Sequence, residues 1–291
     1  MQLGKLGVWS ATDPLTVPEL ETLARRVESQ GYGALWVPES RGHESFSLCA
    51  HLLARTERLV LATGIANLYA RDPVTARQGQ HTLAKLSGGR FLLGLGVSHI
   101  PAVEGLRGHT YGKPVPTMRA YLDAMDQATA AAPTLPEAPP LVLAALGPHM
   151  SRLAARRTRG LHPYNVTPEH TAWARALVGP QPWICVEQKV LLLDDPARAR
   201  AAARQAMSHY LPLPNYRNAW LRLGFSEAEL ADGGNERFLD AMVAWGSADA
   251  LRARVQAHLD AGATHVCIQT VRADGQRLPD FAALEALAPG T

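Results

Sequence analysis

The segment "LVLATGIANLYARDPVTARQGQHTLAKLSGGRFLLGLGVS", residues 59–98, contains the signals of a strand, a helix and a second strand. It opens on an apolar run, which is typical of a buried parallel strand. The part "DPVTARQGQHTLAKLSGG" (72–89) has the proline start and glycine stop of a helix. The apolar run "FLLGLGVS" (91–98) predicts the next strand. Together they predict a βαβ unit with two parallel strands.

The same format recurs along the chain, with helices expected in "TVPELETLARRVESQG" (16–31) and "GSADALRARVQAHLDAGA" (246–263). Eight strands over 291 residues favour a closed (β/α)₈ TIM barrel, as one domain covering 1–291, over an open doubly wound sheet. No G-x-G-x-x-G follows the first strand, and no Walker-type G-x-x-x-x-G-K-[ST] occurs. The predicted strands are 4–10, 34–39, 59–67, 91–98, 141–146, 160–166, 184–193 and 265–271.

Two intervals are longer than a simple crossover, namely residues 99–140 after the fourth strand and residues 194–264 after the seventh. The first contains a loop, a helix and a Pro-rich stretch, and the second contains helices around "YLPLPNYRNAWLRLGF" (210–225). Insertions of this kind usually form lids or extra helices above the active face of a barrel.

Composition restricts the class of protein. Hydrophobic residues make up 47% of the chain and charged residues 19%, which indicates a globular protein. The net charge is only +3 and no dense basic run occurs, which argues against nucleic-acid binding. The most basic segment, "RLAARRTRG" (152–160), is interpreted as the exposed face of a helix.

Three features predict a soluble cytoplasmic protein. No apolar run approaches the ~18 residues of a membrane span, and the first residues lack the pattern of a signal peptide. The three cysteines, Cys49, Cys185 and Cys267, are odd in number, far apart and set in apolar stretches. Buried free thiols in a reducing compartment are therefore expected.

In a TIM barrel the active site lies at the C-terminal ends of the strands, so the polar ends of the apolar runs are expected to meet there. The opening segment shows this change, because its strand leaves the core where the polar residues begin. The expected rim residues are Trp9, Ser10, Glu39 to Arg41, Gly64 to Asn67, Val97 to His99, Gly147 to His149, His162 to Asn165 and Gln269 to Arg272.

Glycines in two segments, one inside the fourth strand and one just after the fifth, allow two interpretations each. Gly94 and Gly96 lie inside a strand, where they indicate either a ligand against the backbone or tight packing within the barrel. Gly147 and Pro148 follow the fifth strand and suit a turn into a helix. The free amides after them can hold an anion, although an ordinary strand-to-helix turn has the same signature.

Four ionisable side chains are candidates for chemistry. His99, His149 and His162 lie at successive strand ends, but no H-x-H, H-E-x-x-H or carboxylate cluster accompanies them, which disfavours a metal. No G-x-S-x-G supports a nucleophilic triad. Glu39, after "LWVP", is either a partly buried proton donor and acceptor or the partner of a basic neighbour such as Arg41.

The strand ends together resemble the luciferase-like flavin and deazaflavin oxidoreductases, over nearly the whole chain. "TGIANLYARDP" (63–73), "GRFLLGLGVSH" (89–99) and "LAALGPHMSRLAAR" (143–156) are similar to the third, fourth and fifth strands of members that use coenzyme F420. "GLHPYNVTPEH" (160–170) and the 210–225 segment resemble a subgroup of F420-dependent oxidoreductases of the same superfamily.

The resemblance implies a bulge with a non-proline cis peptide in the third strand, at Gly64–Ile65, pressed against the middle ring of the deazaflavin. It also implies that Asn67 approaches the polar edge of the ring and that Glu39 lies near ring and substrate. The cofactor-binding residues carried over are Gly64, Ile65, Ala66, Asn67, Val97, Ser98, Ala145, Leu146, Gly147, Pro148, His149 and Met150.

The implied activity is hydride transfer between C5 of F420 and a small organic substrate, with Glu39 or His99 handling the proton. His99 stands where the sugar-phosphate dehydrogenases of the family carry a glutamate, so a sugar-phosphate substrate is not expected. His99 itself is either a candidate acid, since histidine titrates near neutrality, or a structural residue. Trp9, Tyr69, Tyr164 and Trp220 either line the substrate space or belong to the core. The alternatives are an FMN-dependent monooxygenase and a non-catalytic cofactor-binding protein. The family also implies a homodimer.

Overall fold

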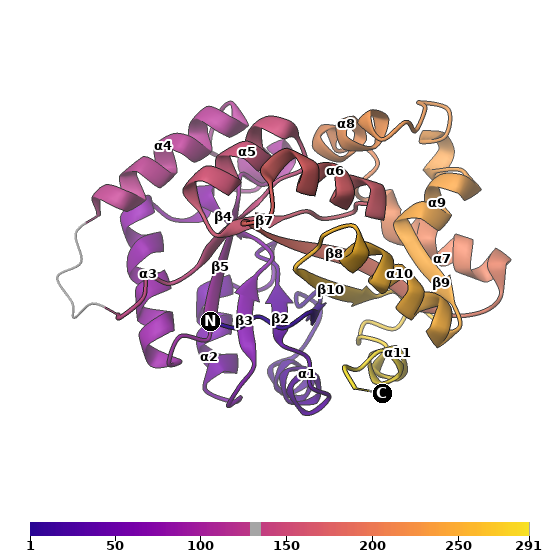
Figure 1. The fold of residues 1–291 in the computed structure, drawn as a ribbon, viewed down its shortest axis with the longest axis horizontal. Coiled ribbons are helices and arrows are strands. Elements are labelled where there is room, and N and C mark those ends of the chain that lie inside the picture. Colours follow the sequence, from indigo (N-terminus) through magenta and orange to yellow (C-terminus); the bar gives the residue numbers. More distant parts are fainter. Residues whose placement is uncertain (129–134, 291) are drawn as a thin grey trace.

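The structure, a computed structural model, describes residues 1–128 and 135–290. Eight parallel strands close into a barrel, in which β1 pairs with β2 on one side and with β10 on the other, and β10 pairs with β8 (Figure 1). The predicted (β/α)₈ TIM barrel is therefore confirmed. The barrel strands are β1 (Leu6–Trp9), β2 (Ala34–Val37), β3 (Val60–Thr63), β5 (Phe91–Gly96), β6 (Leu141–Ala144), β7 (Gly160–His162), β8 (Trp183–Leu192) and β10 (His265–Thr270).

Several helices start at residues whose side chains cap them. Asp72 accepts a hydrogen bond from the Thr75 N–H at 3.0 Å and Pro73 follows it, which begins α3 as expected. The helices are α1 (Val17–Ser29), α2 (Ser45–Leu53), α3 (Pro73–Leu86), α4 (Pro114–Gln127), α5 (Pro148–Arg157), α6 (Pro168–Val178), α7 (Pro196–Ser208), α8 (Pro214–Arg222), α9 (Glu236–Met242), α10 (Ala248–Asp260) and α11 (Phe281–Ala286), with short turns η1 (Leu68–Ala70), η2 (Pro101–Gly105) and η3 (Ala231–Gly233).

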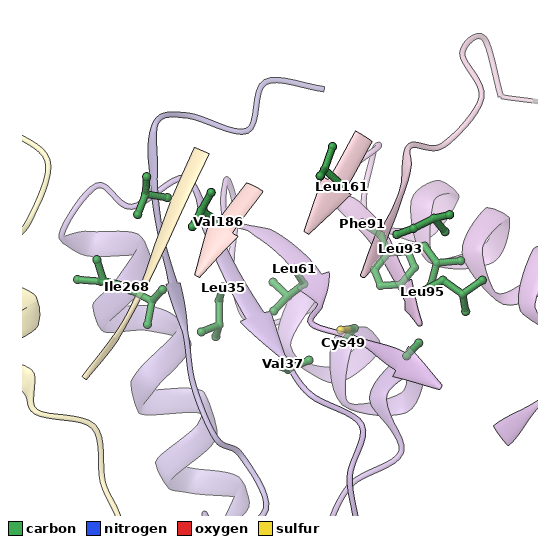
Figure 2. Packing of buried hydrophobic residues seen from close by; sticks show 14 of the residues in the cluster. Leu35, Val37, Cys49, Leu61, Phe91, Leu93, Leu95, Leu161, Val186 and Ile268 are labelled. Atoms are coloured by element: carbon green, nitrogen blue, oxygen red, sulfur yellow. The ribbon is translucent and has the colours of Figure 1, made fainter. Parts of the chain in front are cut away.

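Alternate residues of the strands build two separate apolar layers. Leu35, Leu61 and Phe91 face outward and pack against the surrounding helices (Figure 2). Their sequence neighbours Trp36 and Leu92 belong to a second cluster, which fills the barrel and continues into the insertion helices α7, α8 and α9. Both faces of each strand are thus buried, which explains the continuous apolar runs in the sequence.

Both predicted insertions are present. The first carries η2 and α4, and part of its Pro-rich stretch (129–134) lies outside the described residues. The second carries α7, α8, η3 and α9, grouped on one side of the barrel (Figure 1), and also a strand that the sequence analysis did not predict, β9 (Val243–Gly246). β9 forms because the ten-residue β8 extends beyond the short β7, which pairs with it only at Trp183 and Ile184. The edge of Lys189–Leu192 on the β7 side is therefore left for β9, which pairs with these four residues.

The third predicted strand is split. β3 ends at Thr63, and β4 (Ala66–Asn67) resumes the pairing against Leu95 and Gly96 of β5. The intervening bond Gly64–Ile65 is a cis peptide, as the family resemblance implied. The expected bulge is therefore present at the C-terminal rim.

The glycines of β5 have a packing reason. A Cβ on Gly94 would lie 2.0 Å from the Thr63 carbonyl oxygen, and a Cβ on Gly96 would lie 2.6 Å from Cδ1 of Ile65. Thr63 also exchanges hydrogen bonds with Gly94, since its hydroxyl donates to the carbonyl oxygen at 2.7 Å and accepts from the N–H at 2.9 Å. The structure thus supports tight packing at these two positions.

The cysteines agree with expectation, because all three are buried and free. Within residues 1–128 and 135–290, no helix combines the length and apolar character needed to cross a bilayer.

Candidate active site

Three strand ends meet beside the bulge. The Trp9 indole N–H donates to the Gly64 carbonyl oxygen at 2.9 Å, and the Trp9 ring lies 5.1 Å from that of Tyr164, just past β7. The Tyr164 hydroxyl donates to Oε1 of Gln269, on β10, at 2.7 Å. Trp9 and Gln269 line a cavity of about 230 Å³ at this rim, together with Ser10 and residues 270–272. Side chains from the ends of β1, β7 and β10 are therefore in contact at this rim.

Glu39 is fully engaged by neighbours. Its carboxylate forms an ion pair with Arg71, whose Nη1 lies 3.1 Å from Oε2, and it accepts the Asn67 N–H at 2.8 Å. The exposed fractions of the two side chains are 3% and 9%. Burial opposes the charge of Arg71, but its bonds to Glu39 and Glu44 outweigh this and raise its pKa. The basic neighbour anticipated from the sequence is thus Arg71 rather than Arg41.

The end of β5 turns sharply into the first insertion. Ser98 has a φ of 57°, in the left-handed region that few non-glycine residues occupy. Its carbonyl oxygen accepts a hydrogen bond from the Tyr111 hydroxyl at 3.3 Å. The turn places Val97 and Ser98, both half-buried, at the rim.

His99 follows this turn and meets the second insertion. Its ring lies 5.5 Å from that of Tyr216, on α8. Burial lowers the pKa of His99 below its usual range, against an opposing hydrogen bond with Asn215. The imidazole is therefore neutral near pH 7, which makes it suited to accept a proton.

The start of α5 has the features of an anion site. Gly147 begins the helix without a side-chain cap, and Ser151 in the same turn has a buried hydroxyl without a partner among the described residues. A guanidinium nitrogen of Arg222 lies 3.5 Å from the Cβ position of Gly147 and donates to the Leu146 carbonyl oxygen at 3.3 Å. Arg222 has no carboxylate partner within residues 1–128 and 135–290. Ala145 and Met150 are buried beside this turn.

The three rim histidines do not converge. His162 is 2% exposed, and its Nδ1–H donates to the Cys185 carbonyl oxygen at 2.7 Å, while Nε2 has no partner in the described structure. Burial lowers the pKa of His162 to about 4. His149 is exposed on α5, and His99 lies against Tyr216. In the described part of the chain, no group of three or more His, Cys, Asp or Glu is arranged to hold a metal.

The aromatic candidates separate into different environments. Trp9 lines the cavity and Tyr164 donates a hydrogen bond to its lining residue Gln269, whereas Tyr69 stacks on Tyr111 at 5.9 Å and accepts the Gly112 N–H. Trp220 is fully buried and donates its indole N–H to a backbone carbonyl oxygen at 3.0 Å. Its packing is that of a core residue.

A buried charged cluster was missed in the sequence. Lys189 is 2% exposed, lies 3.2 Å from a Glu187 carboxylate oxygen, and donates to Oδ1 of Asn165. Its ammonium lies 4.1 Å from the ring centre of Tyr164 and 5.0 Å from that of Tyr210. Burial lowers the pKa of Lys189, and the attraction of Glu187 opposes this.

One signal for this cluster was available in "ICVEQKVLL" (184–192). Glu187 and Lys189 interrupt an apolar strand at a spacing of two, which places both side chains on one face. Two opposite charges on one buried face indicate a buried ion pair. The pattern does not predict the aromatic partners, Tyr164 and Tyr210, because they come from other segments.

Comparison with known proteins yields a family match and several relatives. The profile described as luciferase-like monooxygenase matches residues 1–265. A Mycobacterium tuberculosis protein, whose name provisionally assigns it as a coenzyme F420-dependent oxidoreductase, is 37% identical over 128 residues. This match covers 44% of the chain and 36% of the relative. The chain spans between about a third and a half of the lengths of the first curated relatives it matches.

Solved structures share the fold. An F420-dependent secondary alcohol dehydrogenase in complex with an F420–acetone adduct superposes with a TM-score of 0.75 at 14% identity, covering 99% of this chain and 97% of the other. The oxygenating constituent of 3,6-diketocamphane monooxygenase from Pseudomonas putida, in complex with FMN, gives 0.70 at 16% identity, covering 100% and 98%. At these identities the likeness concerns the fold alone.

Proposed function

The chain belongs to the luciferase-like monooxygenase family, and on that premise we propose that it is an F420-dependent oxidoreductase acting on a small organic substrate. One observation carries the proposal. An uncapped helix start with an unpaired arginine lies on the same barrel rim as a cavity lined by Trp9 and Gln269. A phosphate-bearing ring cofactor needs both features. The relative named for coenzyme F420 supports a deazaflavin as that cofactor.

The phosphate would be held at the turn into α5. The free amides that follow Gly147, the orphaned Ser151 hydroxyl and the Arg222 guanidinium are all donors, and an anion needs donors. Residues 145–150 form this turn. This set of hydrogen-bond donors therefore fits a phosphate group.

The ring would lie against the bulge. Two neighbouring segments would contact the ring, namely Gly64 to Asn67 and Val97 with Ser98. They are adjacent because β4 pairs with the end of β5. When bound, the deazaflavin supplies a carbon, C5, that accepts or gives up a hydride. The chain's own part is to hold ring and substrate face to face and to exclude water.

His99, and not Glu39, is proposed as the group that exchanges a proton with the substrate. His99 is neutral near pH 7 and stands at the rim, so it can take the proton of a substrate hydroxyl as the hydride leaves the carbon. Glu39 is occupied by Arg71 and by the backbone N–H of Asn67. We propose that Glu39 positions the bulge.

The substrate would occupy the cavity lined by Trp9, with Tyr164 behind the lining residue Gln269 and Trp220 in the supporting core. Tyr69 does not line this cavity and packs on Tyr111 instead. We further propose a single barrel domain and a homodimer, both on the family premise. The FMN-bound fold neighbour supports one alternative, an FMN-dependent monooxygenase.

The cofactor preference can be measured by titrating the purified protein with F420 and with FMN while following tryptophan fluorescence. We expect micromolar or tighter F420 binding and at least about tenfold weaker FMN binding, because the relative named for coenzyme F420 supports a site built for the deazaflavin. Arg222→Gln should weaken both, since it removes a phosphate contact. The reverse preference contradicts the proposal and favours the monooxygenase. Binding of neither would mean that the residue 145–150 turn is an ordinary helix start.

His99→Asn should lower turnover by about 10²–10³-fold and leave F420 affinity nearly unchanged, because a general base acts on the chemical step. Turnover would be followed by deazaflavin absorbance with small alcohols, aldehydes and ketones. The parent should lose activity as the pH falls through the lowered pKa of His99, and the variant should lack this dependence.

His51→Asn, on helix α2, is the matched control. Unchanged turnover in His99→Asn would assign His99 to packing against Tyr216. A parent without turnover would favour a non-catalytic binding protein.

A further inference from the structure

A groove between α4 and α5 is lined mainly by arginines. Its volume is about 310 Å³, and the two helices lie side by side (Figure 1). The lining residues are Val115 and Arg119 from α4, and His149, Arg152, Leu153, Arg156 and Arg157 from α5. This is the segment that the sequence marks as most basic.

The charges in this arginine groove are largely uncompensated. Arg157 forms ion pairs with Asp123 at 2.7 Å and with Asp126 at 2.9 Å. Arg119, Arg152 and Arg156 are exposed and have no carboxylate partner within the described residues. An ordinary exposed helix face pairs opposite charges three or four residues apart. Here three guanidinium groups face one hollow without a counter-charge.

The groove begins at the proposed phosphate turn. His149 lies in the first turn of α5, two residues after Gly147, and also lines the groove. Arg152 and Arg156 follow on later turns, so Arg156 stands about 10 Å from His149 along the axis, at ~1.5 Å per residue. A chain attached beyond a phosphate at this turn, if it followed α5, would therefore lie next to Arg152 and Arg156.

We propose that this groove binds an oligocarboxylate chain, namely the oligoglutamate tail that F420 carries beyond its phosphate. The inference rests on the proposed function and extends it to the part of the cofactor that FMN lacks. Guanidinium groups bind carboxylates in a bidentate manner. Val115 and Leu153 provide an apolar floor for the methylene groups between the carboxylates. Three unpaired arginines thus match several negative charges in series.

Single-stranded nucleic acid fits this groove less well. Proteins that hold such strands combine basic residues with aromatic side chains on which bases stack. No phenylalanine, tyrosine or tryptophan lines the groove. Carboxylates spaced by methylene groups are the better match to arginines over Val115 and Leu153.

The experiment compares F420 carrying several glutamates with F420 lacking all glutamates, by calorimetric titration. In the parent, the long-tailed form should bind about tenfold more tightly, because several exposed ion pairs contribute a little each. Arg152→Gln/Arg156→Gln should abolish this ratio and leave the affinity of the tailless form unchanged. Arg58→Gln/Arg198→Gln, which removes the same charge from exposed sites on other elements, should keep the ratio. The ratio should also shrink as salt rises from about 0.05 to 0.5 M.

The inference is overturned if the parent binds both forms of F420 equally, or if the Arg152/Arg156 variant retains the ratio. A failure of the cofactor proposal is a separate outcome. Free γ-linked hexaglutamate, labelled with a fluorophore, is therefore titrated against the parent and both double variants. Binding that disappears only in the Arg152/Arg156 variant would support the groove even if F420 itself did not bind. Retained binding in that variant would contradict it.

Discussion

Arg71→Met is expected to lower the free energy of unfolding by about 3–5 kcal/mol at neutral pH, because it leaves the buried carboxylate of Glu39 without its cation. Glu39 is 3% exposed and Arg71 is 9% exposed. Methionine retains the apolar stem but removes the guanidinium, whose Cζ lies 4.3 Å from the centre of the Phe46 ring, so the loss includes this cation–π contact. The loss is therefore assigned to charge. Urea unfolding followed by circular dichroism measures it.

Three further variants separate charge from shape. Glu39→Gln should cost less than Arg71→Met, because Arg71 keeps its second partner Glu44. The double variant Glu39→Gln/Arg71→Met should be more stable than Arg71→Met alone, since no buried carboxylate remains unpaired. Arg25→Met, in an exposed pair with Glu21, should change stability by less than about 1 kcal/mol. A double variant no more stable than Arg71→Met would contradict this account.

The same pair is expected to influence cofactor binding. Glu39 accepts the backbone N–H of Asn67, so it ties the bulge to the end of β2. Glu39→Gln should weaken F420 binding while the bound fraction still turns over. Full cofactor binding with abolished turnover would instead identify Glu39 as the proton carrier.

Acid is expected to destabilise the fold steeply between pH 6.5 and about 4. Burial lowers the pKa values of His162, His170 and His265 to about 4 and that of His258 to about 3. The unfolded chain binds protons at these histidines near pH 6.5, but the folded chain does not until about pH 4 or below. Stability is therefore complete above pH 6.5 and is lost as the pH falls through this window.

The size of the acid effect follows from proton linkage. Each histidine contributes roughly 1.4 kcal/mol per pH unit once its unfolded form is protonated, so several acting together can unfold a domain of ordinary stability. Urea unfolding at pH 7.5, 6.5, 5.5 and 5.0 measures the slope. His170→Gln should reduce the slope by about one proton, whereas His149→Gln, on the surface, should not. A flat profile down to pH 5 would contradict neutral buried histidines.

Much of the fold was determined by local patterns in the sequence. Apolar runs bounded by turn residues predicted all eight barrel strands, and proline–glycine signals predicted the helices between them. These signals are local, because each depends on side chains within one element. β9 was missed, since its pairing depends on how far β8 extends beyond β7.

Tertiary structure decided the partners within the candidate site. Arg71 reaches Glu39 across 32 positions of sequence, and Lys189 meets the rings of Tyr164 and Tyr210 only inside the closed barrel. Arg119 and Arg152 share a groove only because α4 and α5 pack side by side. The sequence by itself determined which residues reach the rim, since strand periodicity and strand ends are local. Barrel closure decided which of these residues form ion pairs, which stack on aromatic rings and which keep no partner. It does so because it brings distant segments within hydrogen-bonding range.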